Sequence, residues 1–265
     1  MIGIFDSGLG GLSALKEVRR LLPDEDIIYF GDTGRVPYGS RSKTTIIKYA
    51  LQDMNFLMSH HIDAVLVACG TVSSNAMEAL RQHYPDIPVV GVIDSGARSA
   101  VQATKNGIIG ISGTAATIAS GAYERKLREI NPSLTVLPTP CPLFVPLVEN
   151  GFIDPEDEVT RLVADRYLSH MREAGADTLI LGCTHYPIIS GSIQRVLPGV
   201  KLINVAAAAA EELRDIITQR ADRKPGSGKT EYYVSDEPHG FEQIASLFLR
   251  QEITDTVTRI DIEKY

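Results

Sequence analysis

Two short segments, far apart in the chain, follow almost the same pattern. Each is an apolar run of strand length that ends in a small residue, a cysteine and polar side chains. The segments are Val65-Leu66-Val67-Ala68-Cys69-Gly70-Thr71 and Leu179-Ile180-Leu181-Gly182-Cys183-Thr184-His185. Such runs are typical of buried strands in parallel sheets, and in open α/β sheets ligands bind at the carboxyl ends of the strands. The pattern therefore predicts two equivalent strands, each with a thiol where a site is expected.

Strand-like and helix-like segments alternate along the chain. In the first half the predicted strands lie at 2–5, 27–30, 64–68 and 89–92, and the predicted helices lie near 12–22, 44–60 and 74–83. After residue 204 we expect a helix to about residue 218, a loop at 219–229, a strand at 232–235 and a helix near 241–250, which return to the first half. Alternation of this kind indicates an α/β fold with largely parallel sheets.

The second half of the chain repeats the scheme of the first half. Residues 109–114 match residues 2–8 in a strand that is followed by a turn with glycine and a hydroxyl side chain. A spacing of 25 residues to the next strand also recurs, from Ile4 to Tyr29 and from Ile111 to Val136. The repeat predicts two similar doubly wound domains with mostly parallel sheets, related by pseudo-twofold symmetry, with the active site in the cleft between them.

The domain boundaries follow from this repeat. The first domain is expected to comprise residues 1–93 and 206–265 and to carry Cys69, and the second is expected to comprise residues 94–205 and to carry Cys183. Buried strands resemble one another in composition, so a single large doubly wound sheet remains an alternative.

Composition and charge exclude several classes of protein. The chain has 265 residues, 44% of them hydrophobic, and a formal net charge of -7 without a cluster of Lys and Arg, which argues against a nucleic-acid partner. No apolar run approaches the roughly 20 residues of a membrane span. Met1 leads directly into a predicted strand without a basic, cleavable leader, so we expect a cytoplasmic protein with no membrane partner.

The paired cysteines are candidates for catalysis, because two thiols that face each other can remove a proton from one side of a carbon atom and return one on the other. In a reducing compartment the three cysteines would remain thiols. A helix N-terminus after each strand is expected to lower the thiol pKa from about 8.5 toward neutrality. His185 could assist protonation at Cys183, whereas Cys141, between two prolines, is interpreted as structural. Neither Cys69 nor Cys183 has the Cys-x-x-Cys neighbour typical of structural zinc sites, so no metal is expected.

Asp6 and Ser7 end the first predicted strand, on the same expected sheet edge as Cys69. Asp6 is the candidate to position or polarise a catalytic partner, although Asp and Ser also favour turns and helix caps. The glycines at 8–11 resemble part of a dinucleotide-binding fingerprint, but Ser13 stands at its last glycine position. A nucleotide-dependent α/β enzyme is therefore a weaker alternative.

Four segments are specific enough to identify a family. They are Phe5-Asp6-Ser7-Gly8-Leu9-Gly10-Gly11, Gly31-Asp32-Thr33-Gly34-Arg35-Val36-Pro37-Tyr38-Gly39, Cys141-Pro142-Leu143-Phe144-Val145-Pro146-Leu147-Val148-Glu149 and Leu181-Gly182-Cys183-Thr184-His185-Tyr186-Pro187. With these motifs, spread over almost its whole length, the chain resembles the glutamate racemases of the cofactor-independent aspartate/glutamate racemase superfamily.

The resemblance implies a two-base mechanism without a cofactor, in which one thiolate takes the α-proton and the opposite thiol delivers a proton to the other face. Cys69, supported by Asp6, would act on D-glutamate, and Cys183, supported by Glu149 and His185, would act on L-glutamate. The residues implied to hold the substrate are Asp6, Ser7, Tyr38, Gly39, Gly70, Thr71, Thr184 and His185. Family members often form dimers and supply D-glutamate for peptidoglycan, so a homodimer is expected.

Stabilisation of the deprotonated substrate is the chemical problem, since an amino-acid α-proton is far less acidic than a thiol and no pyridoxal is expected to spread the charge. Hydrogen bonds to the developing enediolate, and close placement of the thiols, must supply the stabilisation. Ser7, Thr71 and Thr184 are suitable donors, and Thr114 and Thr117 could reach the same anion.

Gly70 departs from the family pattern, which commonly has an asparagine that contacts the substrate at this position. A racemase for aspartate or another amino acid is therefore the nearest alternative. A non-enzymatic alternative is a binding protein that has kept the fold, by analogy with the DNA gyrase-binding side role of some family members.

Overall fold

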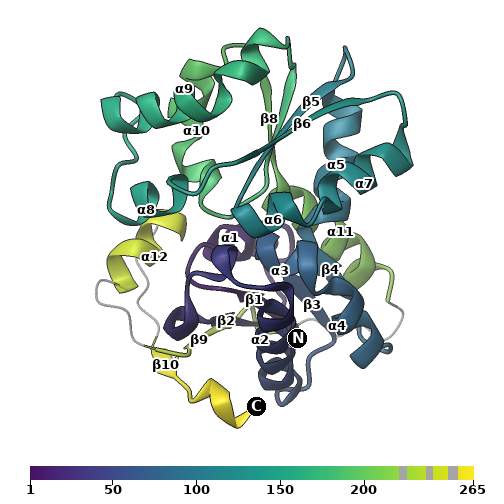
Figure 1. The fold of residues 1–265 in the computed structure, drawn as a ribbon. Coiled ribbons are helices and arrows are strands. Elements are labelled where there is room, and N and C mark those ends of the chain that lie inside the picture. The colour runs from purple at the N-terminus through teal and green to yellow at the C-terminus, as the bar shows by residue number, and fades with distance from the viewer. Residues whose placement is uncertain (221–225, 237–240, 250–255) are drawn as a thin grey trace.

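The computed structural model describes residues 1–220, 226–236, 241–249 and 256–265 (Figure 1). Figure 1 shows two α/β units, one above the other, and both chain termini lie in the lower unit. Among the helices within these ranges, none is both long and apolar enough to cross a bilayer.

The lower unit contains a parallel sheet of six strands in the order β10-β9-β2-β1-β3-β4. Its strands are β1 (Ile2–Asp6), β2 (Ile27–Gly31), β3 (Ala64–Val67), β4 (Val89–Gly91), β9 (Thr230–Val234) and β10 (Val257–Arg259). The expected return of the C-terminal part to the first half is confirmed, because β9 pairs with β2.

The upper unit contains a parallel sheet of four strands in the order β6-β5-β7-β8, which are β5 (Ile108–Gly113), β6 (Thr135–Pro140), β7 (Thr178–Leu181) and β8 (Lys201–Asn204). This order repeats β2-β1-β3-β4 strand for strand. The two-sheet α/β fold is therefore confirmed and a single large sheet is wrong, while the domain boundaries near residues 93 and 205 stay a prediction.

The registers of the central strands place the two cysteines at equivalent positions. Phe5 pairs with Val67 and Ser112 pairs with Leu181, and each cysteine follows the second member of its pair by two residues. The sequences 65–71 and 179–185 are thus structural counterparts, as their common pattern predicts.

The equal spacing of 25 residues in the two halves does not extend to the pairing of the strands. Ile4 pairs with Tyr29, but Ile111 pairs with Pro138 rather than with Val136. The spacing of 25 residues therefore does not determine which residues pair, because the helix and loops between two strands can differ in length for the same pairing. The proline lies in β6 at the edge of its sheet, where a residue without an N–H group is tolerated.

Helices flank both sheets. They are α1 (Leu12–Leu21), α2 (Lys43–Met58), α3 (Gly70–Asn75), α4 (Met77–His83), α5 (Val92–Ala103), α6 (Ala115–Ala119), α7 (Ala122–Ile130), α8 (Phe144–Glu149), α9 (Glu158–Glu173), α10 (Ser190–Val196), α11 (Val205–Thr218) and α12 (Phe241–Leu249), with short 3-10 helices η1 (Thr33–Arg35), η2 (Tyr38–Ser40), η3 (Tyr186–Ile189) and η4 (Ile262–Lys264). The helix expected at 74–83 is two helices, and the first begins directly after Cys69.

The two units share apolar packing. Helix α11 packs against α1 of the lower unit and against α5, and it buries Ala209, Leu213 and Ile217. One hydrophobic cluster includes Ile4 of the lower sheet and Ile111 of the upper sheet. Burial of this shared surface holds the carboxyl ends of the two sheets in a fixed relation.

Candidate active site

Polar residues that follow four strands meet where the two sheets face each other. Thr71, after β3, and Thr114, after β5, are joined by a hydrogen bond of 2.9 Å between their hydroxyl oxygens. The glycine turn after β1 lies against the segment after β7, because a Cβ atom at Gly10 would lie 2.7 Å from Nδ1 of His185. Ser13 Oγ also approaches the carbonyl oxygen of Thr184 at 3.5 Å. The structure therefore brings the residues around both cysteines into one site.

Cys69 precedes α3 and is buried, with 5% of its surface exposed. Its thiol donates a hydrogen bond of 3.4 Å to Ser7 Oγ. Burial, together with the negative charge of Asp6, raises the pKa of Cys69 to about 12. The expected shift toward neutrality is therefore wrong for Cys69: in the substrate-free site burial outweighs the start of a short helix, and the group is a thiol.

Asp6 is buried beside Cys69 at the end of β1. Its Oδ2 atom accepts hydrogen bonds from the backbone N–H groups of Gly8, at 3.2 Å, and Gly11, at 3.0 Å. Its Oδ1 atom is buried and has no hydrogen-bond partner in the described part of the chain. Burial raises the pKa of Asp6, although His185 opposes this shift. Because two amides of the glycine turn are bonded to Asp6, the turn is not arranged as a free cradle for a nucleotide phosphate.

His185 links Cys183 to Glu149. Its Nδ1 atom lies 3.8 Å from Cys183 Sγ, and its Nε2 atom lies 3.0 Å from Glu149 Oε1. Burial alone would lower the pKa of His185, but the contacts with Cys183 and Glu149 outweigh burial and raise it to about 10. The ring of Phe248, from α12, packs edge-on against the imidazole at 5.2 Å between ring centres. His185 is thus a buried imidazolium at neutral pH, next to the second thiol.

Threonine hydroxyl groups lie beside the two cysteine segments. Thr114 is bonded to Thr71 and, at 2.9 Å, to the hydroxyl of Thr117. Thr184 Oγ1 lies 3.4 Å from His185 Nδ1. These hydroxyls can donate to an anion if they rotate away from one another, so they are candidates to bind a carboxylate or an enediolate.

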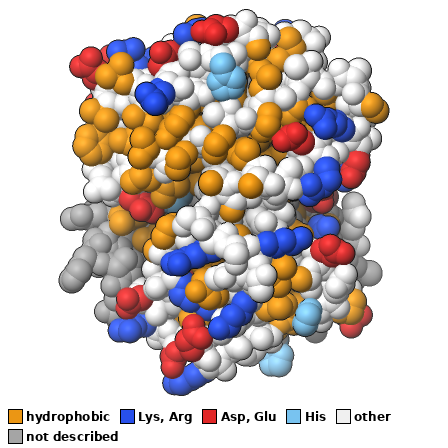
Figure 2. All heavy atoms as spheres, viewed as in Figure 1, with side chains coloured by type: hydrophobic (Ala, Val, Ile, Leu, Met, Phe, Trp, Pro, Cys, Tyr) orange, Lys and Arg blue, Asp and Glu red, His pale blue; other side chains and the backbone are white. Residues whose placement is uncertain are grey.

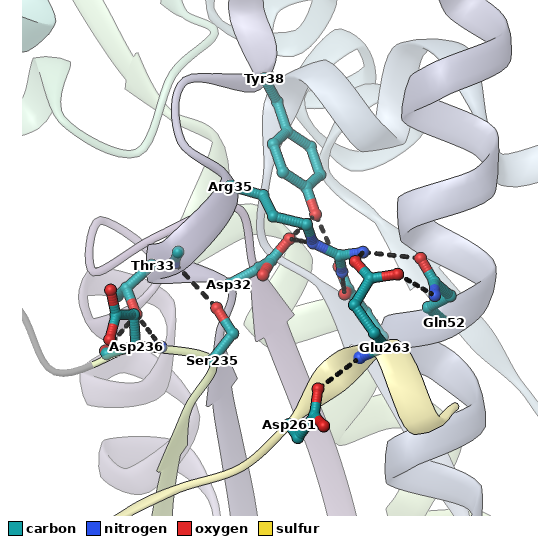
Figure 3. A network of polar contacts seen from close by, with 11 residues as sticks. Asp32, Thr33, Arg35, Tyr38, Gln52, Ser235, Asp236, Asp261 and Glu263 are labelled. Carbon is teal, nitrogen blue, oxygen red and sulfur yellow. Dashed lines mark hydrogen bonds and ion pairs between the residues drawn. The ribbon is translucent and has the colours of Figure 1, made fainter.

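Tyr38 and Gly39 lie in different surroundings from the other residues that were expected to bind the substrate. The Tyr38 hydroxyl lies between the carboxyl groups of Asp32 and Asp53, with 3.2 Å to Asp53 Oδ2 (Figure 3). Gly39 lies against Thr114, since a Cβ atom there would lie 2.8 Å from Thr114 Cβ. The phenol group of Tyr38 therefore belongs to a buried polar network. The neighbouring Gly39, and not the Tyr38 side chain, contacts the candidate active site.

Gly70 has a steric reason to be glycine in this chain. A Cβ atom at position 70 would lie only 2.1 Å from the carbonyl oxygen of Gly182, which precedes Cys183. The backbones of the two cysteine segments therefore touch directly. A side chain at position 70 requires the two segments to move apart.

Several residues of the site could not be identified from the sequence. Phe248 comes from a helix far along the chain and has no motif around it. Tyr29 donates a hydrogen bond of 2.8 Å to the carbonyl oxygen of Gly8 and so holds the glycine turn, but its sequence context is that of an ordinary buried strand. Arg35 lies in one of the four motifs on which the family resemblance rests, but nothing in the sequence indicated a role for it.

Comparisons of the sequence and of the structure with known proteins all point to one family. The family model for Asp/Glu/hydantoin racemase matches residues 11–213. The chain is 46% identical to a glutamate racemase of Geobacter metallireducens, over 99% of this chain and 97% of that protein. It is 47% identical to a glutamate racemase of Chlorobaculum tepidum, over 96% of this chain and 94% of that protein.

A solved structure shows the same arrangement in three dimensions. The glutamate racemase of Francisella tularensis in complex with D-glutamate superimposes with a TM-score of 0.90 and 37% sequence identity. The match covers 100% of this chain and 98% of that chain. The two-sheet architecture is therefore common to this chain and to a protein of known ligand.

The contact at Gly70 leads to a prediction. Gly70→Ala places a methyl group against the Gly182 carbonyl and moves the two cysteine segments apart by about 1 Å, a misplacement that can cost about 100-fold in rate. We expect kcat to fall by at least about 10-fold in both reaction directions, measured by polarimetry. Ser133→Ala, in the exposed loop between α7 and β6, is the control. An unchanged kcat in Gly70→Ala would show that the segments do not need this contact.

The pair of His185 and Glu149 leads to a second prediction. Because Glu149 raises the pKa of His185, Glu149→Gln should let the imidazolium lose its proton at lower pH. The alkaline limb of the pH profile of kcat/KM is expected to move to lower pH by about 1 pH unit. Glu156→Gln, which removes a surface ion pair with Arg195, is the matched control. If the alkaline limb of Glu149→Gln stays at the wild-type pH, Glu149 does not raise the pKa of a catalytically important His185.

Proposed function

The chain belongs to the Asp/Glu/hydantoin racemase family, and we propose that it is a glutamate racemase in which Cys69 and Cys183 transfer protons at Cα from opposite faces. Racemisation of glutamate is the activity named for relatives that cover nearly the whole chain. The observation that supports the roles of the thiols is their equivalence: each ends a central strand, β3 or β7, of one of two sheets with the same strand order.

The surroundings of the thiols support a division of labour. The imidazolium of His185 can donate a hydrogen bond to Cys183 when its sulfur carries a negative charge, so Cys183 is suited to take the α-proton of L-glutamate. Cys69 is a thiol in the substrate-free site and is suited to deliver a proton to the other face. For the reverse direction Cys69 must lose its proton, and a bound α-ammonium group would favour its thiolate.

Asp6 is placed to receive that ammonium group. Its Oδ1 atom is buried and unpartnered in the described part of the chain, whereas Oδ2 is fixed by the backbone of the glycine turn. A buried carboxylate oxygen without a donor is unfavourable until a ligand supplies one. Binding of the ammonium group at Asp6 would also place a positive charge close to Cys69.

The hydroxyls of Ser7, Thr71, Thr114 and Thr184 are proposed to bind the α-carboxylate. They lie at the ends of strands of both sheets, so an anion bound among them is held from two sides. The carboxylate gains negative charge when the α-proton leaves, and hydrogen bonds aimed at that charge in a dry site lower the barrier. This stabilisation is what a racemase without pyridoxal requires.

The exposed apolar surface of the upper unit supports a homodimer. Large apolar side chains near α8 and α9 are exposed, among them Leu143, Phe152, Val159 and Leu162, with exposed fractions from 39% to 54%. Figure 2 shows apolar side chains gathered over this upper unit. Contiguous apolar surface of this kind is typical of protein interfaces. Sedimentation of the pure protein should show a dimer that Leu162→Glu dissociates, and a wild-type monomer at micromolar concentration contradicts this.

We also propose that the protein acts in the cytoplasm, where it would supply D-glutamate for peptidoglycan. The three cysteines are free in the structure, and a reducing compartment keeps such thiols in the form that proton transfer needs.

Formation of D-glutamate from L-glutamate by the pure protein tests the proposed function. Wild-type protein should convert either enantiomer into a mixture of both, without added cofactor. Cys69→Ala and Cys183→Ala should each lower kcat by at least about 100-fold, the order of a general acid or base. Cys141→Ala, at a buried cysteine outside the pair, is the matched control and should stay active. Absence of D-glutamate with wild-type protein, or full activity in either single-cysteine variant, rejects the proposal.

A further inference from the structure

An ionic network surrounds the guanidinium group of Arg35 (Figure 3). Arg35 is its centre: Nε donates to Asp32 Oδ2 at 2.7 Å, and Nη2 donates to Asp53 Oδ1 at 2.9 Å. Nη1 donates to Gln52 Oε1 at 2.6 Å and lies 3.4 Å from Glu263 Oε1. The side chains of Asp32 and Asp53 are fully buried, and that of Arg35 is 10% exposed.

The network joins three segments of the chain. Asp32 and Arg35 come from the connection after β2 that contains η1, Gln52 and Asp53 come from α2, and Glu263 comes from η4 near the C-terminus. The guanidinium also packs over a ring of α2, at 4.1 Å from the centre of the Tyr49 ring. These contacts hold the Arg35 side chain in one position within the fold, whereas an arginine exposed to solvent could adopt several.

Burial of these charged groups carries a desolvation penalty. Replacement of a buried ion pair by apolar residues often leaves stability unchanged or increases it. One guanidinium faces two buried carboxyl groups, and burial and the neighbouring Asp32 raise the pKa of Asp53 well above its usual range. The arrangement is therefore better explained by what it positions than by a gain in stability.

What it positions is the segment 36–39. The Tyr38 hydroxyl lies between Asp32 and Asp53, so the network fixes this residue. On one side of Tyr38, a Cγ atom of Val36 lies 3.1 Å from the position of a Cβ atom at Gly8. On the other side, Gly39 lies against Thr114. The segment therefore connects the glycine turn of the lower unit with a hydroxyl group of the upper unit.

We infer that Arg35 is a positioning residue for racemisation, because it holds Tyr38 so that Gly39 fixes Thr114 and its bonded partner Thr71 at the substrate carboxylate. This role rests on the proposed function. Arg35 touches no substrate in this arrangement and acts through segment 36–39. The fork of the guanidinium is essential to it, since an ammonium group cannot bridge Asp32, Asp53 and Gln52 in one plane.

Arg35→Lys and Asp53→Asn test this inference. Lysine keeps the charge, and asparagine resembles the protonated carboxyl, so both variants should fold. We expect each to lower kcat/KM for glutamate by about 10-fold or more per folded molecule, and the affinity for D-glutamate, measured by calorimetry, to fall as well. Arg172→Lys, at an arginine that pairs with Asp165 on the surface of the upper unit, is the matched control and should behave as wild type.

A double-mutant cycle separates positioning from a loss of stability. If Arg35 acts through Thr114, Arg35→Lys combined with Thr114→Val should cost little more than the more severe single change, because residues that act as a unit are not additive. Wild-type kcat/KM in both Arg35→Lys and Asp53→Asn, or fully additive effects in the cycle, overturns the inference. If the wild type does not racemise glutamate, the proposed function fails, and the calorimetric affinities for D-glutamate still decide whether Arg35 positions the site.

Discussion

The direct contact between the two cysteine segments is the constraint on which the site depends. Gly70 meets the carbonyl oxygen of Gly182, so the ends of β3 and β7 approach as closely as backbone atoms allow. Asp6 and His185 are buried near this contact, and the electrostatic effects of buried groups are larger than those of groups in solvent. The shared apolar core around α11 holds the two sheets together, as the proposed action of residues from both sheets on one small ligand requires.

The two thiols are equivalent in the fold and unequal in their surroundings. Cys69 lies beside the carboxylate of Asp6, which together with burial holds it in the thiol form. Cys183 lies beside the imidazolium of His185, which Glu149 supports. A negative charge is thus disfavoured at the Cys69 sulfur in the substrate-free site. In the proposed mechanism one sulfur removes a proton while the other donates one, so the two must differ in protonation when the substrate is bound.

Much of the fold was predictable because it depends on local patterns. Apolar runs predicted most strands of both sheets, and the repeated cysteine segment predicted the equivalence of β3 and β7, but β8 and β10 were not predicted. The pairing of Ile111 with Pro138 was not predictable, because loop lengths do not determine register. Contacts between distant segments could not be predicted from the sequence either. The approach of Phe248 to His185 and the direction of the Tyr38 hydroxyl toward Asp53 depend on tertiary packing. The raised pKa of Cys69 follows from burial that the sequence does not show.

The central claim, that two opposed thiols act one on each enantiomer, is tested most directly by the fate of the α-hydrogen in deuterium oxide. L-glutamate would be incubated with the wild-type protein, and both enantiomers would be separated at low conversion and analysed by mass spectrometry. Transfer by two thiols should leave deuterium at Cα of the newly formed D-glutamate, while the remaining L-glutamate keeps its protium. Deuterium that appears equally fast in the recovered L-glutamate would indicate a single base that serves both faces, which is incompatible with two opposed thiols.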